Sequence, residues 1–237
     1  MWVSQRGSLD SPWGTPQNLG PNINTSANEQ CAHLPPDGHT LLFASNRSGG
    51  VGGDDLYVAR RRNQRDDFSW DIPENLGGGV NSASTDFTPG YMEDENGTIT
   101  LYFMSNRPGG PGGSDIYASV MGNDGTFGPA VSVPELNISA SELFPTPRRD
   151  GLELFLSSNR TGTLGGQDLW VSTRASTADP WSTPANLGPL VNSGSNELGG
   201  GLSFSRTSLF FHSNRPLGEG GVDLYEITRD KLTGQNK

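Results

Sequence analysis

Three features are scarce in this sequence, and each scarcity argues against a class of protein. The only cysteine in the 237 residues is Cys31, so no internal disulfide can form. No run of about 18 apolar residues occurs, which argues against a transmembrane helix. Lys and Arg number 16 against 26 Asp and Glu, giving a net charge of -10. Nucleic acids and anionic membrane surfaces both require positive charge, so neither is an expected partner.

Helical periodicity is also missing, because apolar residues do not recur at a spacing of 3.6 over a dozen positions. Met1 is followed directly by domain-like sequence, which predicts no signal peptide here. Glycine and proline are abundant, at 33 and 17 residues. Together with the regularly placed aromatic residues, this composition indicates many short strands joined by turns rather than disorder.

One stretch occurs four times and organises the chain. Each copy holds an apolar run, then Ser-Asn-Arg, a glycine-rich bend, and then Asp, an aliphatic residue and an aromatic residue. The copies are Leu42–Arg60, Leu101–Val120, Leu154–Arg174 and Leu209–Arg229. In every copy the Asp follows the Asn by nine positions, at Asn46 and Asp55, Asn106 and Asp115, Asn159 and Asp168, and Asn214 and Asp223.

The complete repeat has a period near 55 residues and predicts four strands per unit. A first strand follows the pattern N-x4-[Asp/Glu], the second is the apolar run, the third carries Asp-[Leu/Ile]-[Tyr/Trp], and the fourth begins at an aromatic residue near a proline. Four-stranded units in such an array predict an all-β fold, a single β-propeller of four blades spanning 1–237. The units are approximately 21–76, 77–136, 137–188 and 189–229, with 1–20 closing the ring.

Ring closure rests on the ends of the chain. The last unit contains three strands, and the segment near Trp13 has the pattern of a fourth. We therefore expect the N-terminal segment to complete the C-terminal blade, which would remove a free sheet edge. Trp2–Gln5 would then be a surplus strand, since it resembles the third strand Leu169–Ser172. A five-bladed ring with one incomplete blade is the alternative.

The combined pattern N-x4-Glu, Pro-Asp-Gly and Ser-Asn-Arg-x-Gly-Gly-x-Gly-Gly-x-Asp-[Leu/Ile]-[Tyr/Trp] resembles the TolB-type (WD40-like, PD40) propeller repeats. The resemblance covers nearly the whole chain. It implies a propeller of the kind common in bacterial envelope and secreted proteins, and hence a periplasmic or secreted location. It implies little about activity, because such repeats serve as binding scaffolds and also occur beside enzyme domains.

The Ser-Asn-Arg arginines and the third-strand aspartates recur once per unit on adjacent strands. We interpret them as structural, with an Arg–Asp pair inside each blade, because every blade would need the same pair. An anion-binding ring is the functional alternative. The residues are Arg47, Arg107, Arg160 and Arg215, with Asp55, Asp115, Asp168 and Asp223.

The acids at the start of the first strands predict a metal site. If these strands are innermost, Glu29, Asp86, Glu142 and Glu197 converge on one end of the central channel. Four such charges need compensation, and oxygen ligands suit Ca²⁺ or another divalent cation. Nearby asparagines would add ligands or orient the acids, at Asn24, Asn81, Asn137 and Asn192. Hydrogen bonds from backbone amides are the alternative compensation.

Differences between the copies point to a site in the first one. Glu29, Cys31 and His33 alternate along one side of the first strand, where the other copies carry Thr88 and Gly90, Phe144 and Thr146, and Gly199 and Gly201. His33 is the candidate base or metal ligand, with Glu29 as its catalytic partner and Cys31 as a softer ligand. His212 replaces Ala44, Met104 and Ser157 and is a further candidate. A packed histidine and a buried small cysteine are the structural alternative.

These patterns leave three functions open. The first is a metal-stabilised binding module that presents one channel mouth to a small molecule, a glycan or a protein. The second is a metal-dependent hydrolase of esters, lactones or phosphotriesters, argued from analogy with unrelated propellers. The third is a glycoside hydrolase, which needs two carboxyl groups of differing pKa close together.

Overall fold

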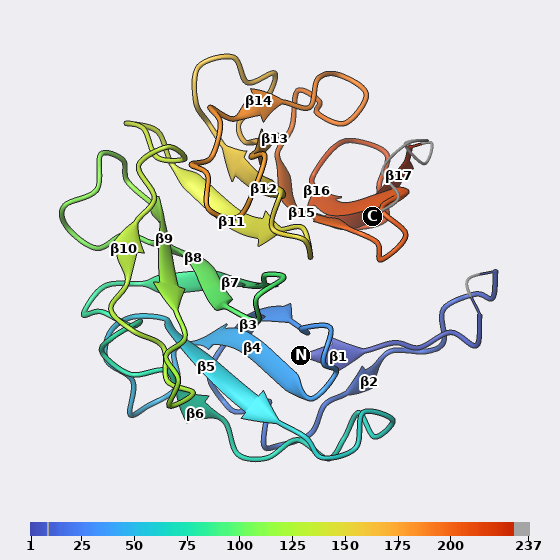
Figure 1. Ribbon diagram of the computed structural model, residues 1–237. Helices are drawn as coiled ribbons and strands as arrows, with labels where there is room; N and C mark the ends of the chain where they lie inside the picture. The colour runs from blue at the N-terminus through green and yellow to red at the C-terminus, as the bar shows by residue number, and fades with distance from the viewer. Residues whose placement is uncertain (9, 230–237) are drawn as a thin grey trace.

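A computed structural model describes residues 1–8 and 10–229 of the chain. Its strands form four blades and one separate ribbon (Figure 1). The ribbon pairs β1 (Trp2–Val3) with β2 (Gln17–Asn18). The blades are β3 (Glu29–His33), β4 (Thr40–Ser45), β5 (Asp55–Arg60) and β6 (Glu74–Asn75); β7 (Asp86–Glu93), β8 (Ile99–Ser105), β9 (Asp115–Val120) and β10 (Val131–Ser132); β11 (Glu142–Pro147), β12 (Glu153–Ser158), β13 (Asp168–Thr173) and β14 (Ala185–Asn186); and β15 (Glu197–Leu202), β16 (Ser208–Ser213) and β17 (Asp223–Thr228).

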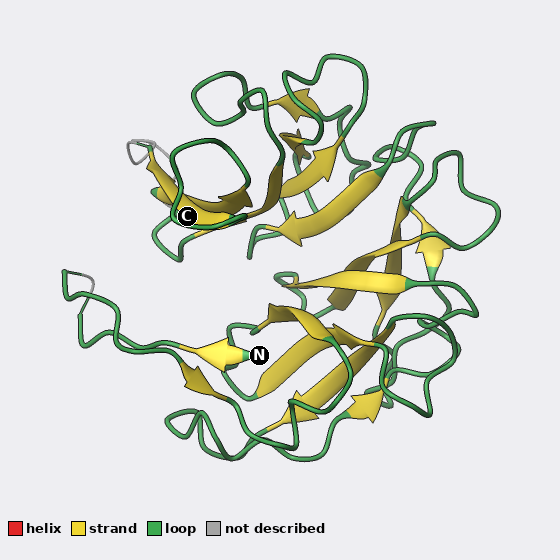
Figure 2. Ribbon diagram, turned by 180° about the vertical axis from the view of Figure 1, so that it is seen from behind, coloured by secondary structure: helices red, strands yellow, loops and turns green. Residues whose placement is uncertain are grey.

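Every blade is an antiparallel meander, and the described residues contain no helix (Figure 2). The all-β fold and the four-bladed propeller predicted from the repeat are therefore confirmed. Within the described ranges, no helix is long and apolar enough to cross a membrane.

The hairpin between the first and second strands uses a left-handed residue in each blade. Gly38, Gly97 and Gly151 have φ values of 62°, 79° and 70°, as the Asp-Gly and Asn-Gly pairs predict. The fourth copy lacks this glycine, yet Arg206 adopts a φ of 64° at the corresponding place. The turn is therefore kept in all four blades, and the last one carries backbone strain that the others avoid.

The apolar core lies between consecutive blades rather than inside them. Tyr117 of the second blade, for example, joins the cluster of Leu42, Leu56 and Val58 from the first. Equivalent clusters join the second blade to the third and the third to the fourth. A further cluster joins the β1–β2 ribbon to the first blade through Met1 and Val3. Each sheet thus presents one face forward to the next blade and one face back to the preceding one.

The prediction that the N-terminal segment completes the C-terminal blade is wrong. The last blade is three-stranded, in the order β15-β16-β17, and β2 pairs with β1 instead. Trp2 and Val3 stand opposite Asn18 and Gln17, in the same register that joins third and fourth strands elsewhere. Because β1 already provides β2 with a third strand, β2 is not available to β17. No strand of the last blade contacts β1 or the first blade.

The first strands contain a repeated β-bulge. The ladder to the second strand slips by one residue between Gln30 and His33, and at the same place in the other three blades. The residue inside each bulge is left-handed: Cys31, Thr88, Phe144 and Gly199, with φ values of 54°, 53°, 51° and 68°. Three of the four carry a side chain at a cost of about 1–2 kcal/mol each.

The fourth bulge should tolerate a side chain poorly. A Cβ atom at Gly199 would lie 3.0 Å from the Cε1 and Nδ1 atoms of His212, in addition to the left-handed backbone. We expect Gly199→Ala to lower the free energy of unfolding by about 1–2 kcal/mol, or roughly 2–4 °C in Tm per kcal/mol. Gly194→Ala is the matched control, because nothing lies within 4 Å of its Cβ position. Equal Tm values for the two variants would contradict this account.

Candidate functional site

The first-strand acids are each held by the arginine of their own blade. In the third blade, Arg160 Nη2 lies 3.1 Å from Glu142 Oε1 and donates to the carbonyl oxygen of Leu136 at 2.7 Å. The Nε of Arg160 donates to Ser158 Oγ at 3.1 Å. The same arrangement, which we call the arginine clamp, recurs as Arg47–Glu29 at 3.3 Å, Arg107–Asp86 at 2.5 Å and Arg215–Glu197 at 3.0 Å.

Aromatic rings of the second and third strands support each clamp. The guanidinium of Arg215 lies 5.1 Å from the ring centre of Phe211 and 4.7 Å from that of Tyr225. Arg47 and Arg107 lie over the corresponding pairs, and Arg160 lies over Trp170. A guanidinium can make cation–π contacts and bind a carboxylate, a hydroxyl and a backbone carbonyl at once, so the clamp is a structural element of every blade.

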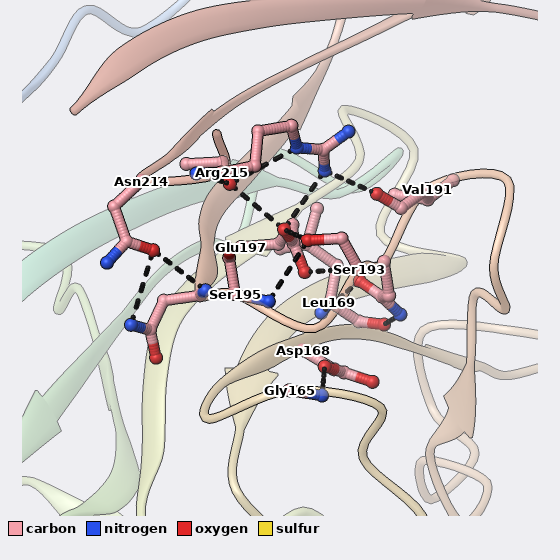
Figure 3. A network of polar contacts seen from close by, with 12 residues as sticks. Gly165, Asp168, Leu169, Val191, Ser193, Ser195, Glu197, Asn214 and Arg215 are labelled. Carbon is pink, nitrogen blue, oxygen red and sulfur yellow. Dashed lines mark hydrogen bonds and ion pairs between the residues drawn. The ribbon is translucent and has the colours of Figure 1, made fainter. Parts of the chain in front are cut away.

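Figure 3 shows the clamp of the fourth blade with its surrounding loop. Glu197 accepts hydrogen bonds from the backbone amide of Ser193 at 2.8 Å and from its hydroxyl at 2.6 Å. Asn214 accepts from the backbone amide of Asn196 at 2.9 Å. The Ser-Asn-Arg motif thus binds the loop and the acid that precede it in the chain, which explains why its three residues recur together.

The third-strand aspartates have a different partner from the one predicted. Asp168 accepts from the backbone amides of Leu164 at 2.7 Å and Gly165 at 3.2 Å, inside its own glycine-rich bend. Asp55, Asp115 and Asp223 do the same in their blades. The predicted Arg–Asp pair is therefore wrong, because the bend occupies the aspartate and the first-strand acid occupies the arginine.

The asparagine before each of the last three blades binds the third strand of the preceding blade. Asn192 accepts from the Leu169 amide at 2.8 Å and donates to the Leu169 carbonyl at 3.0 Å. Asn81 and Asn137 bind Leu56 and Ile116 in the same way. Asn24 binds the amino group and the carbonyl of Met1. The asparagine side chain therefore substitutes for a backbone strand residue.

The four acids do not fit the calcium site predicted from the sequence. Each is already neutralised by an arginine, and a bound cation would have to displace it. Among residues 1–8 and 10–229, no group of three or more His, Cys, Asp or Glu side chains is placed to hold a metal ion. The metal site remains a prediction from the sequence, and nothing below depends on it.

The clamps differ in the pKa of their acid. Burial alone would raise the pKa of Glu197, but hydrogen bonds from Ser193 and Ser213 and the charge of Arg215 outweigh burial and lower it. Glu142 shows the reverse, since burial dominates and raises its pKa despite Arg160. Glu142 is the more deeply buried of the two acids. It also lacks one hydroxyl donor, because Ile138 stands where Ser193 stands in the fourth blade and offers only its backbone amide beside the bonds from Ser158 and Arg160.

The bulge residues meet in a chamber of about 410 Å³ in the central channel. Cys31, Thr88, Phe144 and Gly199 all line it, so one residue from each blade faces the axis. His33, Thr146, Gly201 and His212 line it as well. The structure therefore brings together the positions that differ between the repeats. Glu29 is absent from this lining, so the predicted His33–Glu29 catalytic pair does not share the chamber.

The chamber is uncharged. Burial, reinforced by Asp54, raises the pKa of the Cys31 thiol to about 12, so the thiol stays protonated. Burial lowers the pKa of His33 to about 4, and its Nε2 accepts from the Tyr91 amide at 3.4 Å. Burial also lowers the pKa of His212. Thr88 is 4% exposed, and its hydroxyl has no hydrogen bond partner among the described residues. A neutral imidazole already engaged at Nε2 is a poor general base.

A larger cavity of about 1160 Å³ lies at the hairpin end of the channel and shares His33, Thr146 and Gly201 with the chamber. This end is opposite the first-strand acids, so the mouth predicted from those acids does not hold the cavity. The wall combines aromatic and charged residues. Phe204 is 84% exposed beneath the Arg149 guanidinium, which lies 5.2 Å from the ring centre.

Fixed ion pairs line the same cavity. Arg148 contacts Asp150 at 2.7 Å and Glu153 at 2.8 Å, while Arg206 contacts Asp150 at 3.3 Å. Burial is the largest influence on Asp150, but Arg148 and the Leu152 amide outweigh it and lower the pKa of Asp150. The cavity therefore offers rigid donors and acceptors side by side, together with exposed aromatic surface. Sequence reasoning missed this mouth because its residues lie in hairpins that differ between the copies.

Comparison with known proteins supports the fold alone. No protein-family model and no curated protein matches this chain. Among solved structures, it is similar to an endo-arabinase from Bacteroides thetaiotaomicron, at 15% identity and a TM-score of 0.56 over 84% of this chain and 73% of that one. It is similar to a GH62 alpha-L-arabinofuranosidase from Coprinopsis cinerea, at 14% identity and a TM-score of 0.58 over 90% and 77% of the two chains.

A third similar structure is a protein assigned as TolB from Agrobacterium tumefaciens. It shares 15% identity and a TM-score of 0.53, over 96% of this chain and 74% of that one. The resemblance of the repeat to TolB-type propellers is therefore supported in part. The fold is a propeller and one similar structure is TolB-like, but no family model matches the repeat.

Replacing one clamp arginine tests the structural role assigned to these residues. Arg160→Lys keeps the charge but cannot bind Glu142, Leu136 and Ser158 together, so we expect the free energy of unfolding in chemical denaturation to fall by about 1.5–3 kcal/mol. Arg60→Lys is the control, because the Arg60–Glu74 pair is exposed and such pairs contribute about 0–1 kcal/mol. Similar losses in both variants would show that the clamp is dispensable.

The opposite pKa shifts predict opposite pH dependence for two variants. A carboxyl whose folded pKa is lowered stabilises the fold above its ordinary value of 4.5 and loses that effect as the pH falls through the folded pKa. The Tm deficit of Glu197→Gln should therefore shrink on acidification. Glu142, with a raised pKa, takes up its proton first in the folded state, so the deficit of Glu142→Gln should grow. Parallel Tm curves between pH 7 and pH 3.5 would refute the assignment.

Proposed function

We propose that this propeller is a binding module for uncharged oligosaccharides, which enter the cavity at the hairpin end of the channel. The observation that carries the proposal is the cavity of about 1160 Å³, which shares His33, Thr146 and Gly201 with the uncharged chamber on the axis. Large concave sites at the end of a propeller channel, with a few convergent polar groups, are typical ligand sites.

The chemistry of the wall favours a sugar. The linked pairs Arg148–Asp150 and Arg206–Asp150 hold planar donors next to acceptors, which matches the adjacent hydroxyl groups of a sugar ring. Phe204 offers an exposed aromatic face for the C–H side of such a ring. The similar endo-arabinase and arabinofuranosidase structures support the same class of ligand by fold analogy.

Binding is better supported than hydrolysis. A glycoside hydrolase needs a carboxylic acid of raised pKa beside a second carboxylate. In this cavity Asp150 has a lowered pKa because Arg148 holds it, and Asp94 is engaged with the Asn96 and Thr98 amides of its turn. The acids with a raised pKa, Glu142, Asp54 and Asp115, do not line this cavity, and Glu142 belongs to a buried clamp at the other end of the first strand. Glycoside hydrolysis is therefore the second candidate.

Two variants test the site without disturbing the core. Phe204→Ala and Arg206→Ala should each raise the Kd for arabino- or xylo-oligosaccharides at least tenfold, which corresponds to about 1.4 kcal/mol, while leaving Tm within about 2 °C. Leu190→Ala is the control, because Leu190 is 85% exposed and does not line the cavity. Isothermal titration calorimetry measures the affinities.

The same titrations decide between the candidates. Binding without release of reducing sugar supports the module, and release of reducing sugar that Asp150→Asn abolishes supports the hydrolase. If the folded protein binds neither oligosaccharide series, or if the Leu190 variant loses affinity as much as the other two, the proposal fails.

A further inference from the structure

The forward face of the last blade is exposed where the same face of every other blade is covered. Leu224 is 87% exposed, whereas its counterparts Leu56, Ile116 and Leu169 are each 0% exposed. Phe210 is 37% exposed, while its counterparts Leu42, Tyr102 and Phe155 are between 1% and 4%. In the other blades these residues pack against the next sheet. The forward face of the last blade is therefore an apolar surface of the kind that packs against a neighbouring sheet in the other three blades.

Strand β1 likewise lacks the packing contact that the third strands of the blades make through their aromatic residue. Strand β1 takes the place of a third strand, because it pairs with β2 as β13 pairs with β14, and because Met1 binds Asn24 as Leu169 binds Asn192. Trp2 is consequently the counterpart of Tyr57, Tyr117 and Trp170. Those three side chains are 4%, 6% and 6% exposed, and Trp2 is 66% exposed.

These two surfaces match each other by the rule that the other interfaces follow. Tyr117 of the second blade packs on Leu42 and Leu56 of the first, so a third-strand aromatic residue covers the forward face of the blade before it. Trp2 is the third-strand aromatic residue that faces the opening, and Leu224 and Phe210 form the forward face across it. Figures 1 and 2 both show the β1–β2 ribbon and the last blade on opposite sides of this opening.

We infer that the ring closes at this seam, with Trp2 of β1 packing on Leu224 and Phe210 of the last blade. The occupant of the exposed face is thus the ribbon of the same chain. The ribbon is already fixed to the first blade through Met1 and Val3, so closure moves the last blade and the ribbon together without unpairing a strand. Strand contacts between these parts are absent in the open form.

Closure changes the cavity as well as the ring. His33, Leu34 and Pro36 line the cavity from the first blade, and Leu202, Phe204 and Arg206 line it from the last. Because the seam runs between these two blades, closing it brings the two walls of the cavity together. The opening and closing of the ring therefore controls how a ligand enters and how tightly it is enclosed, whatever that ligand is.

Thermal unfolding tests the inference on the complete chain. Leu224→Asp places a charge in the closed seam, and we expect Tm to fall by at least about 4 °C. Val131→Asp is the matched control, because Val131 is also an apolar strand residue, in β10, and is 62% exposed. If Leu224 stays as exposed as in the open form, both variants will behave alike, and that result would overturn the inference.

Tryptophan fluorescence gives a second, independent readout. The difference spectrum between the wild type and Trp2→Phe isolates the emission of Trp2, which should be blue-shifted as for a buried indole. Leu224→Asp should return that emission to the position of a water-exposed indole. Emission of an exposed indole in the wild type would overturn closure. A blue shift that appears only as the protein concentration rises over about a hundredfold range would assign the face to a second copy and overturn it equally.

Discussion

The structure depends on one buried ion pair repeated in every blade, the arginine clamp. It joins the end of the second strand to the start of the first and to the loop arriving from the preceding blade, through the arginine contacts with Glu142, Ser158 and Leu136. A lone buried charge costs far more than a pair, so acid and arginine are each retained because the other is present. The aromatic residues beneath the guanidinium then fix the same side chain in the interface between blades.

The sequence was sufficient for the blades because a fixed spacing repeated four times leaves few alternatives. It was not sufficient to predict which acid the arginine of each blade binds. Ser45 stands between Glu29 and Asp55 in one row of the sheet, so an arginine two residues later can reach either acid. Which acid it binds is decided by the glycine-rich bend, whose amides occupy Asp55. The same contacts explain why the structure gives no support to the metal prediction. Backbone amides and arginine neutralise the first-strand acids, which the sequence analysis had assigned to a cation.

The pairing of the N-terminal segment with the last blade was mispredicted, because a strand of two residues has too few positions to show a sequence pattern. Gln17 and Asn18 suit an outer strand of any blade, and only the register with Trp2 and Val3 reveals which third strand they join. The differences between copies were more informative. Cys31, His33 and His212 do meet on the axis, but burial leaves them neutral, so the chamber contrasts with the charged mouth beside it. The sequence shows which residues differ and gives no measure of how deeply they are buried.

The four bulges have a consequence for how this channel can diversify. Glycine, cysteine, threonine and phenylalanine occupy equivalent positions with nearly the same φ, between 51° and 68°. The backbone there is set by the ladders on either side, and each of the four residues lines the chamber on the axis. The first three blades thus accept different side chains at this level of the ring, whereas His212 leaves no room for one at Gly199 in the fourth. A scaffold of this kind separates the residues that select a ligand from those that keep the blades together, so new specificity can arise one blade at a time.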